Sequence, residues 1–433
     1  MTRYCVIGAG AAGISALEQL RKAGYDVDCY EKTDRVGGHW HTDYDALHLI
    51  SSRDTTAFEN FPMPADYPHF PRRDQVRAYI ESYARTHGHY DIIQFNTAVT
   101  ALVPKATDDG VGSTGWTVTL ETGESIDYDG VFVAHGHLWD QKIPQFPGNF
   151  TGKQIHSGSY RNTDDIDGER VLVVGAGNSG CDLAVDAAQS RFDVDIVIRS
   201  GLYFQPKTYF GKPRHEVAFL ADFDPEEQDL INRLLARVSL GQWNDYPGLP
   251  EPRHRTLADG PTVANNLLLY WIHHGRVRVV PGIERFEGKT VHFTDGTQQD
   301  YDTILWATGF NPSVPFLEDG LLQHRNGMPL RYAAGIVPAG LEKLYFIGLT
   351  APRGPMIPIY GMQAKVAIQM AALHEAVGEH GAGVEEYLAG RQEADDRLDI
   401  VRHLWEEQLE DTRRLLAAHP AAKEATGLTE VPL

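Results

Sequence analysis

The sequence predicts an α/β fold in which one chain forms two parallel-sheet domains. Two glycine-rich motifs carry this prediction, Gly8-Ala-Gly10-Ala-Ala-Gly13 and Gly175-Ala-Gly177-Asn-Ser-Gly180. Each follows a short apolar run, 4–7 or 171–174, and precedes a helical stretch, which is the context that a dinucleotide-binding motif requires. Glycine lets the turn approach a pyrophosphate, and free N–H groups at the helix start attract the anion. We therefore expect two Rossmann-like dinucleotide-binding domains, the second inserted in the first.

The residues after the first motif favour FAD as its ligand. The predicted strand 27–30 ends in Glu31, whose carboxylate can accept hydrogen bonds from both hydroxyls of an adenosine ribose and would repel a 2′-phosphate. FAD and NAD both satisfy this condition. The segment 34–40 contains Gly37-Gly38, which lets the chain pass close to an extended cofactor and so favours FAD. An acidic strand end followed by an ordinary turn is the alternative interpretation.

The second motif favours NADPH. Its next predicted strand, 194–198, ends in Arg199 instead of a carboxylate, and a guanidinium fits a ribose 2′-phosphate. Lys207 and Arg214 are candidates to assist or replace Arg199. A solvated surface arginine is the alternative.

Composition narrows the class of protein. The chain has 433 residues, 42% of them hydrophobic, which is enough for two or three globular domains. Its formal net charge of −20 argues against a nucleic-acid partner, because phosphate backbones bind basic surfaces. It shows neither a secretory signal nor a run of 18 apolar residues, so we expect a cytoplasmic protein without a membrane span that acts on a small molecule. A homodimer is left open.

Histidines and cysteines predict neither a metal site nor a redox disulfide. His135, His137 and the pair His273-His274 lack a third ligand at a suitable spacing. The cysteines are isolated, without a CxxC pair, and we expect them to be small apolar fillers. They are Cys5, Cys29 and Cys181.

The pattern along the chain predicts three consecutive parts. The first FAD-binding part (1–160) has a helix at 73–87 and a hairpin of 116–120 with 128–134. An NADPH-binding domain (161–300) follows, and the chain enters it through a linker at 143–158. The second FAD-binding part (301–433) has a strand at 301–306 and helices at 363–374 and 384–418. An aromatic-rich insertion, 202–266, interrupts the middle part. Its rings either pack a core or shape a substrate entrance.

The chain resembles the class B flavoprotein monooxygenases, which comprise flavin-containing and Baeyer–Villiger monooxygenases. Between the two glycine motifs, Phe150-Thr-Gly152-Lys-Gln-Ile-His156-Ser-Gly-Ser-Tyr160 matches the family pattern FxGxxxHxxx(Y/W), and Ala307-Thr-Gly-Phe310 is similar to the family's ATG(Y/F) element. Tyr160 followed by Arg161 is similar to the flavin-containing branch, which implies oxygenation of a soft nitrogen or sulfur centre. One position departs from the family: Ile50 stands where an asparagine is usual, so Ser51 or His48 takes its role or the oxygenated flavin is held differently.

The resemblance implies an NADPH- and O2-dependent reaction through a hydroperoxyflavin. It implies catalytic roles for Ser51, Arg53, His156 and Tyr160, the last two coupling domain position to cofactor binding or acting as a structural hinge. The residues expected to contact cofactors are Gly8, Gly10, Ala11, Ala12, Gly13, Glu31, Lys32, Gly38, His39, Trp40, Ser52, Val99, Gly175, Gly177, Asn178, Ser179, Gly180, Cys181, Asp182, Arg199, Thr308 and Gly309. The alternatives are a Baeyer–Villiger monooxygenase, an NADPH oxidase that releases H2O2, and a flavoprotein without enzymatic activity.

Overall fold

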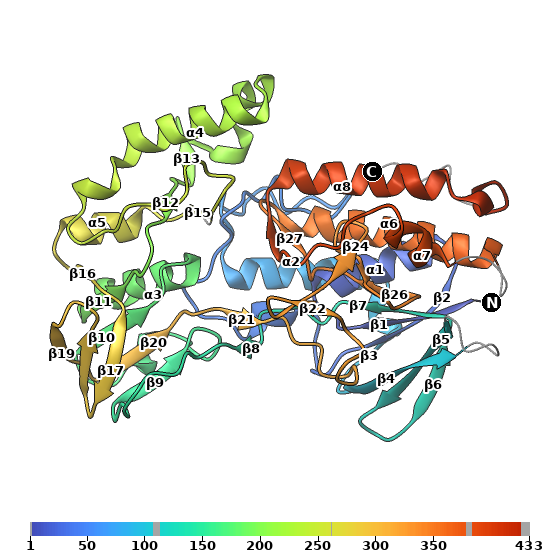
Figure 1. Cartoon of the computed structure of the whole chain (residues 1–433), viewed down its shortest axis with the longest axis horizontal. Helices are drawn as coiled ribbons and strands as arrows, with labels where there is room; N and C mark the ends of the chain where they lie inside the picture. The colour runs from blue at the N-terminus through green and yellow to red at the C-terminus, as the bar shows by residue number, and fades with distance from the viewer. Residues whose placement is uncertain (1, 107–112, 261, 378–382, 426–433) are drawn as a thin grey trace.

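The first unit is built on a five-stranded parallel sheet. The computed structural model describes residues 2–106, 113–260, 262–377 and 383–425, and Figure 1 shows two units side by side. In the first, the strand order is β26-β7-β1-β2-β3, and every pairing is parallel. The strands are β1 (Arg3–Ile7), β2 (Asp26–Tyr30), β3 (Ile93–Gln94), β7 (Gly130–Val133) and β26 (Leu344–Phe346).

The second unit repeats this sheet. Its order is β16-β11-β10-β20-β9, again fully parallel, so the strand before each glycine motif, β1 or β10, lies at the centre of its sheet. The strands are β9 (Lys153–His156), β10 (Arg170–Val174), β11 (Asp193–Val197), β16 (Val277–Val280) and β20 (Thr303–Trp306). Residues 171–174 and 303–306 are buried throughout, as a parallel sheet covered on both faces requires. The predicted fold class is confirmed.

Each unit also carries a three-stranded antiparallel layer, which comes between β3 and β7 in the first unit and between β16 and β20 in the second. In the first unit it is β4 (Val99–Ala106), β5 (Ser113–Leu120) and β6 (Ser125–Tyr128); in the second it is β17 (Ile283–Glu287), β18 (Thr290–Phe293) and β19 (Gln298–Asp300). The predicted hairpin of 116–120 with 128–134 is therefore wrong in its second arm. Asp129 turns the chain after β6, and 130–133 enters the parallel sheet as β7.

The α-helices are distributed over both units. In the first unit they are α1 (Ala11–Lys22), α2 (Arg73–Thr86), α6 (Met356–Val377), α7 (Val384–Ala389) and α8 (Arg402–Ala417); in the second they are α3 (Asn178–Gln189), α4 (Pro225–Leu240) and α5 (Leu267–His273). The helices predicted after each glycine motif, near residue 73, and in the C-terminal part are present. The stretch 384–418 is not one helix, because residues 390–401 leave the helical path and include β28.

Short strands complete the architecture. They pair as β12 (Tyr203–Phe204) with β15 (Thr262–Val263), β13 (Thr208–Tyr209) with β14 (Lys212–Pro213), β22 (His324–Arg325) with β23 (Met328–Pro329), β24 (Arg331–Tyr332) with β25 (Val337–Pro338), and β27 (Ala351–Pro352) with β28 (Asp399–Ile400). The predicted insertion 202–266 contains β12 to β15 and α4, and in Figure 1 α4 stands above the second unit. Asp224 caps α4 by accepting a hydrogen bond from the Glu227 N–H, and Pro225 occupies its first turn.

The chain passes between the units twice, and the two passages pair with each other. They are β8 (Asp140–Gln141) and β21 (Phe310–Asn311), which run antiparallel. Figure 1 shows both between the two sheets. The second sheet takes β9 from before residue 161 and β20 from after residue 300, so the predicted domain limits at those residues cut through it. The sequence did not predict β9, because it lies in a segment rich in Pro and Gly. The apolar strand 303–306 could belong to either sheet by its sequence, so its assignment was not determined.

Steric contact makes Gly13 the most restrictive position of the first unit. A Cβ on Gly13 would lie 1.8 Å from the Gly8 carbonyl oxygen. We expect Gly13→Ala to destabilise the protein by about 3 kcal/mol, because α1 would have to move off the sheet. Thermal unfolding would show a lowered Tm. Gly361→Ala is the matched control: it lies within α6 with nothing within 4 Å of the added methyl, and better helix propensity stabilises it by about 1 kcal/mol. An unchanged Tm for Gly13→Ala would contradict the close approach.

Candidate functional site: two dinucleotide turns and their junction

The first glycine turn joins β1 to α1 at the carboxyl edge of the sheet. Gly8 has a φ of +99°, and a Cβ there would lie 2.7 Å from the Ala134 carbonyl oxygen after β7. Gly10 precedes α1, and no side chain caps the helix. The amides that start α1 therefore face the turn without a side-chain acceptor, which suits a pyrophosphate.

Glu31 and the paired glycines lie against this turn. The Ala9 N–H donates to Glu31 Oε2 (2.7 Å), so the carboxylate is held beside the glycine motif. The Gly37 N–H donates to the Ala9 carbonyl (3.0 Å), and a Cβ on Gly38 would lie 3.3 Å from the Gly10 Cα. The sequence prediction that Glu31 and Gly37-Gly38 act together with the first motif thus corresponds to one continuous cradle, and its shape and polarity fit a dinucleotide with a free ribose diol.

The second turn repeats the first. Gly175 has a φ of +106°, and a Cβ on it would lie 2.5 Å from the Ala307 carbonyl oxygen; a Cβ on Gly180 would lie 1.9 Å from the Gly175 oxygen. Gly177 precedes α3 without a side-chain cap, and nothing lies within 4 Å of the position its Cβ would take. This opening also fits a pyrophosphate.

Arg199 follows β11 at the edge where the second turn lies. It is exposed and forms no ion pair among the described residues. Lys207 and Arg214, named as possible helpers, are otherwise engaged: Lys207 Nζ contacts His48 Nε2, and Arg214 Nη1 donates to Gln205 Oε1 (2.5 Å). Burial lowers the pKa of both. Of the three cations, Arg199 is the one that remains available to an anion in solution.

His156 ties the end of β9 to the second passage between the units. Its side chain is buried; Nδ1 accepts from the Gly158 N–H (3.1 Å), and Nε2 lies 3.0 Å from the Gly309 carbonyl. The ring meets Phe310 edge to face. These contacts require a neutral imidazole that donates from Nε2. Burial lowers the pKa of His156, which favours the same neutral form. Neighbouring Thr308 donates to the Lys142 carbonyl, which closes the same junction from the other passage.

Tyr160 anchors the linker in the second unit. Its ring is fully buried, and its hydroxyl donates to Asp186 Oδ2 (2.8 Å) on α3. Burial raises the pKa of Tyr160, so the hydroxyl stays protonated and remains a donor. Arg161, the next residue, donates through Nη1 to the Asp43 carbonyl (2.8 Å) of the first unit. The consecutive residues Tyr160 and Arg161 therefore bind the second and the first unit, respectively.

The start of α3 contacts the first unit and the insertion. Tyr44 donates to Asp182 Oδ2 (3.1 Å), and Asn265 Nδ2 donates to Asp182 Oδ1 (2.9 Å). Asn178 Oδ1 accepts from the Ala264 N–H (3.1 Å). Burial raises the pKa of Asp182. Asn178 and Asp182, predicted as cofactor contacts, use these side-chain atoms to hold protein segments around α3, while Ser179 lies 3.4 Å from the Tyr44 hydroxyl.

Near Ile50, each polar side chain that the sequence analysis named as a candidate contacts another part of the protein. Ser51 Oγ lies 2.7 Å from Thr56 Oγ1, and Ser52 Oγ donates to Glu216 of the insertion. Arg53 Nη1 donates to the Ala65 carbonyl (2.7 Å). Ser51 and Arg53 thus shape the loop 50–67, and Ser52 joins it to the second unit. His48, the other candidate to replace the missing asparagine, faces Lys207.

The remaining predicted contacts are spread over both units. Lys32 Nζ lies 5.5 Å from the centre of the Trp139 ring, and His39 contacts Asp43 through Nδ1. The other members are placed as follows: Ala11, Ala12 and Gly13 form the first turn of α1, Trp40 belongs to the short helix Gly38–His41, Val99 opens β4, and Cys181 is buried in α3. All three cysteines are buried, as apolar fillers require. Among the described residues, no group of three or more His, Cys, Asp and Glu side chains is arranged to hold a metal ion.

Comparison with known proteins agrees with this geometry. A family model described as flavin-binding monooxygenase-like matches residues 1–377. The chain is 32% identical to flavin-containing monooxygenase 5 of Oryctolagus cuniculus over 84% of this chain and 72% of that protein, and 30% identical to dimethylaniline monooxygenase [N-oxide-forming] 2 of Macaca mulatta over the same shares. Its fold is similar to that of NADP+-bound cyclohexanone monooxygenase from Rhodococcus sp. Phi1, with a TM-score of 0.70, 18% identity and 98% of each chain covered.

The chain belongs to the flavin-binding monooxygenase-like family. FAD and NADPH are the cofactors of this family, so the predicted cofactor pair is confirmed. None of the helices in the described ranges has the length and apolar character needed to cross a bilayer. The predicted cytoplasmic location and the homodimer stay predictions.

The sequence did not predict two residues that bind Asp182 at the start of α3. Tyr44 and Asn265 both bind Asp182, yet they lie 138 and 83 positions from it in the chain. Tyr44 follows no motif, so no sequence signal points to it. Asn265 stands before α5 and accepts from the Leu268 N–H (3.0 Å), and this helix-capping pattern was the one available signal.

His135 and His137, dismissed as metal ligands, predict an acid sensitivity of the first unit. His135 Nε2 lies 2.9 Å from the Ser313 carbonyl, and His137 Nδ1 lies 3.2 Å from that of Gly348. Burial lowers the pKa of each to about 4. The unfolded chain protonates near pH 6.5, so stability is complete above about pH 6.5 and falls as the pH drops toward 4.

We expect the double variant His135→Gln, His137→Gln to lose less Tm than the parent between pH 7.5 and 5, because glutamine keeps an N–H donor and does not titrate. Thermal unfolding across this range measures the slope. His324→Gln, at an exposed histidine, is the control and should keep the parental slope. Equal slopes for the parent and the double variant would contradict the assignment.

Proposed function

We propose that the chain is an NADPH- and O2-dependent flavin monooxygenase that oxygenates a soft nitrogen or sulfur centre of a small molecule. The observation that carries the proposal is the pair of matching glycine turns, one beside Glu31 and one beside Arg199, joined through His156 and Tyr160. Glu31 suits a cofactor without a 2′-phosphate, and Arg199 suits one with it. The choice of nitrogen or sulfur is supported by Tyr160-Arg161 and by relatives named as flavin-containing and N-oxide-forming monooxygenases.

The residues divide the work between binding and positioning. When bound, FAD supplies the redox chemistry: it takes reducing equivalents from NADPH and passes one atom of O2 to the substrate. Gly10 and Glu31 hold FAD, and Gly177 and Arg199 hold NADPH. His156 is a positioning residue, because both of its nitrogens are engaged by backbone groups at the junction. It sets how the two turns face each other.

One observation favours a second function. Ile50 offers no hydrogen-bond donor at a position that the family resemblance assigns to an asparagine, while Ser51 and His48 are engaged elsewhere. A site without that donor retains an oxygenated cofactor less well and releases H2O2. An NADPH oxidase is therefore the alternative.

Coupling distinguishes these functions. We expect a tertiary amine or a thioether to increase NADPH oxidation and to yield one N-oxide or S-oxide per NADPH, with little H2O2, as followed by absorbance, product analysis and a peroxide assay. A ketone that gives an ester at equal yield would replace the proposal by a Baeyer–Villiger activity. Stoichiometric H2O2 with every substrate would establish the oxidase. In the oxidase case, Ile50→Asn should lower peroxide release.

Arg199 is expected to set the preference for NADPH. Its guanidinium is exposed and unpaired among the described residues, so Arg199→Gln should raise KM for NADPH by about tenfold through loss of a charge-assisted contact to the 2′-phosphate, and leave KM for NADH unchanged. Steady-state NAD(P)H oxidation measures both. Arg285→Gln is the control, since Arg285 is an exposed arginine of the same unit on β17. Parallel changes for both cofactors would refute the phosphate contact.

A further inference from the structure

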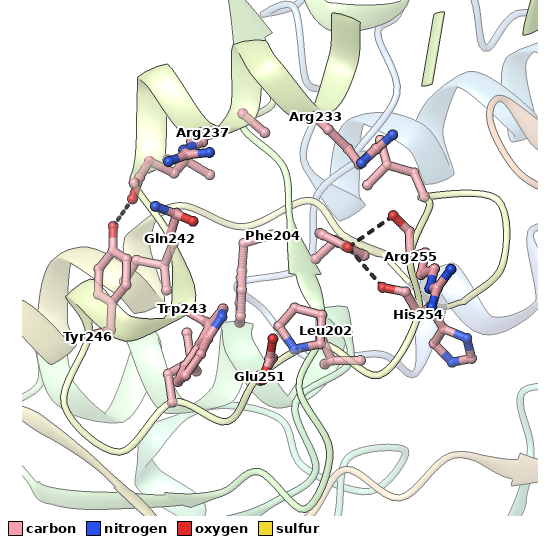
Figure 2. A pocket seen from close by; sticks show the side chains of 18 of the residues that line it. Leu202, Phe204, Arg233, Arg237, Gln242, Trp243, Tyr246, Glu251, His254 and Arg255 are labelled. Carbon is pink, nitrogen blue, oxygen red and sulfur yellow. Dashed lines mark hydrogen bonds between the residues drawn. The ribbon is translucent and has the colours of Figure 1, made fainter. Parts of the chain in front are cut away.

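The insertion forms an open cavity that neither glycine turn uses. Its volume is about 780 Å³, within the range of small-molecule sites. It lies between α4 and the segment 241–257, with β12 at its base, and Figure 2 shows α4 side chains above Phe204 and Trp243. None of the glycines of either motif lines it.

Hydrogen bonds from inside and outside the cavity hold its walls. The Tyr203 hydroxyl donates to the carbonyls of His254 (2.8 Å) and Arg255 (3.3 Å), as the dashed lines in Figure 2 mark. The Leu257 N–H donates to Asp229 Oδ1 on α4 (2.7 Å), which ties the loop to the helix. Arg353 of the first unit donates to the Leu257 carbonyl (2.5 Å). The loop that carries the arginines is therefore fastened at both faces.

The cavity lining is positively charged, whereas the protein as a whole is negatively charged. Asp and Glu outnumber Lys and Arg by 59 to 39 in the chain, yet four arginines and one carboxylate, Glu251, line the cavity. Arg233 pairs with Asp229 (2.7 Å). The other three form no ion pair among the residues that the structure describes; they are Arg237, Arg253 and Arg255. A cluster of uncompensated guanidinium groups over a concave surface attracts an anion.

The rest of the lining is apolar. Leu230 and Leu234 lie one turn apart on α4 and are 60% and 58% exposed, and Phe204 and Trp243 line the same cavity. Exposed leucines on a concave wall keep apolar surface in water unless a ligand covers them. A ligand that satisfies both parts of the lining carries one anionic group and an apolar body.

We propose that this cavity binds an amphipathic organic anion, a carboxylate with an aliphatic or aromatic body. The anionic group lies among Arg237, Arg253 and Arg255, and the apolar body covers Leu230 and Leu234. The site is separate from the NADPH phosphate site. Gly201 pairs with Pro252, so the two are neighbours in the fold, but Arg199 does not line the cavity. The proposal does not depend on the reaction at the flavin.

Calorimetric titration of the holoenzyme with decanoate tests the proposal. We expect saturable binding at one site per chain that persists when NADP+ is saturating, and no binding of decanol or decyltrimethylammonium under the same conditions. Arg237→Glu and Arg253→Glu should each weaken decanoate binding by about tenfold, because a repulsion replaces an attraction. Both lie at exposed positions, and their Tm and NADP+ affinity report whether the fold is intact.

Four results would overturn the site. Loss of decanoate binding in saturating NADP+ would assign the arginines to the dinucleotide. Equal binding of decanol would leave only an apolar surface. Unchanged affinity in both arginine variants would place the ligand elsewhere. Arg285→Glu, which removes an exposed arginine of the same unit outside the cavity, should bind decanoate as the parent does; an equal loss there would mean that only overall charge matters.

Discussion

The contact between the third glycine of each motif and the first is the constraint on which the rest of the structure depends. At Gly13 and at Gly180, no atom beyond Cα fits between the helix and the carbonyl of the preceding turn. Each helix start is therefore held at the end of its central strand, with its free amides at the carboxyl edge of the sheet. The same arrangement at both turns, down to the carbonyl of Ala134 or Ala307, makes two equivalent cradles from unrelated surrounding segments.

Single residues at strand ends set the charge of each cradle. A few contacts between the units set the orientation of one cradle relative to the other. Glu31 and Arg199 come after β2 and β11, the strand that follows each glycine motif, and give the two sites opposite charge. The passages β8 and β21 pair, His156 binds the Gly309 carbonyl, and Tyr44 reaches Asp182. These contacts are directional, and the Tyr44 ring of the first unit also packs into the apolar core of the second, so polar and apolar contacts together fix the relative orientation of the units.

Local patterns in the sequence were sufficient for the cradles and insufficient for their surroundings. A turn, its strand and its helix lie within some twenty residues, so the spacing of Gly8, Gly10 and Gly13 predicts them directly. Sheet membership depends on contacts between distant segments: the strand 303–306 is apolar on both faces and would suit either sheet, and only its pairing with β9 and β10 decides. The partners of Asp182 could not be found for the same reason, since nothing near it in the chain specifies a tyrosine from the first unit.

The repeated topology also locates what is particular to this chain. Sheets, meanders and glycine turns occur twice, so they provide binding and do not by themselves distinguish one substrate from another. The loop 44–72 of the first unit and the insertion 202–266 of the second are among the segments without a counterpart in the other unit. They meet where Ser52 binds Glu216 and His48 binds Lys207. None of the four residues that join the two segments lines the arginine-lined cavity, so the insertion contacts the loop 44–72 with one part of its length and forms the cavity with another.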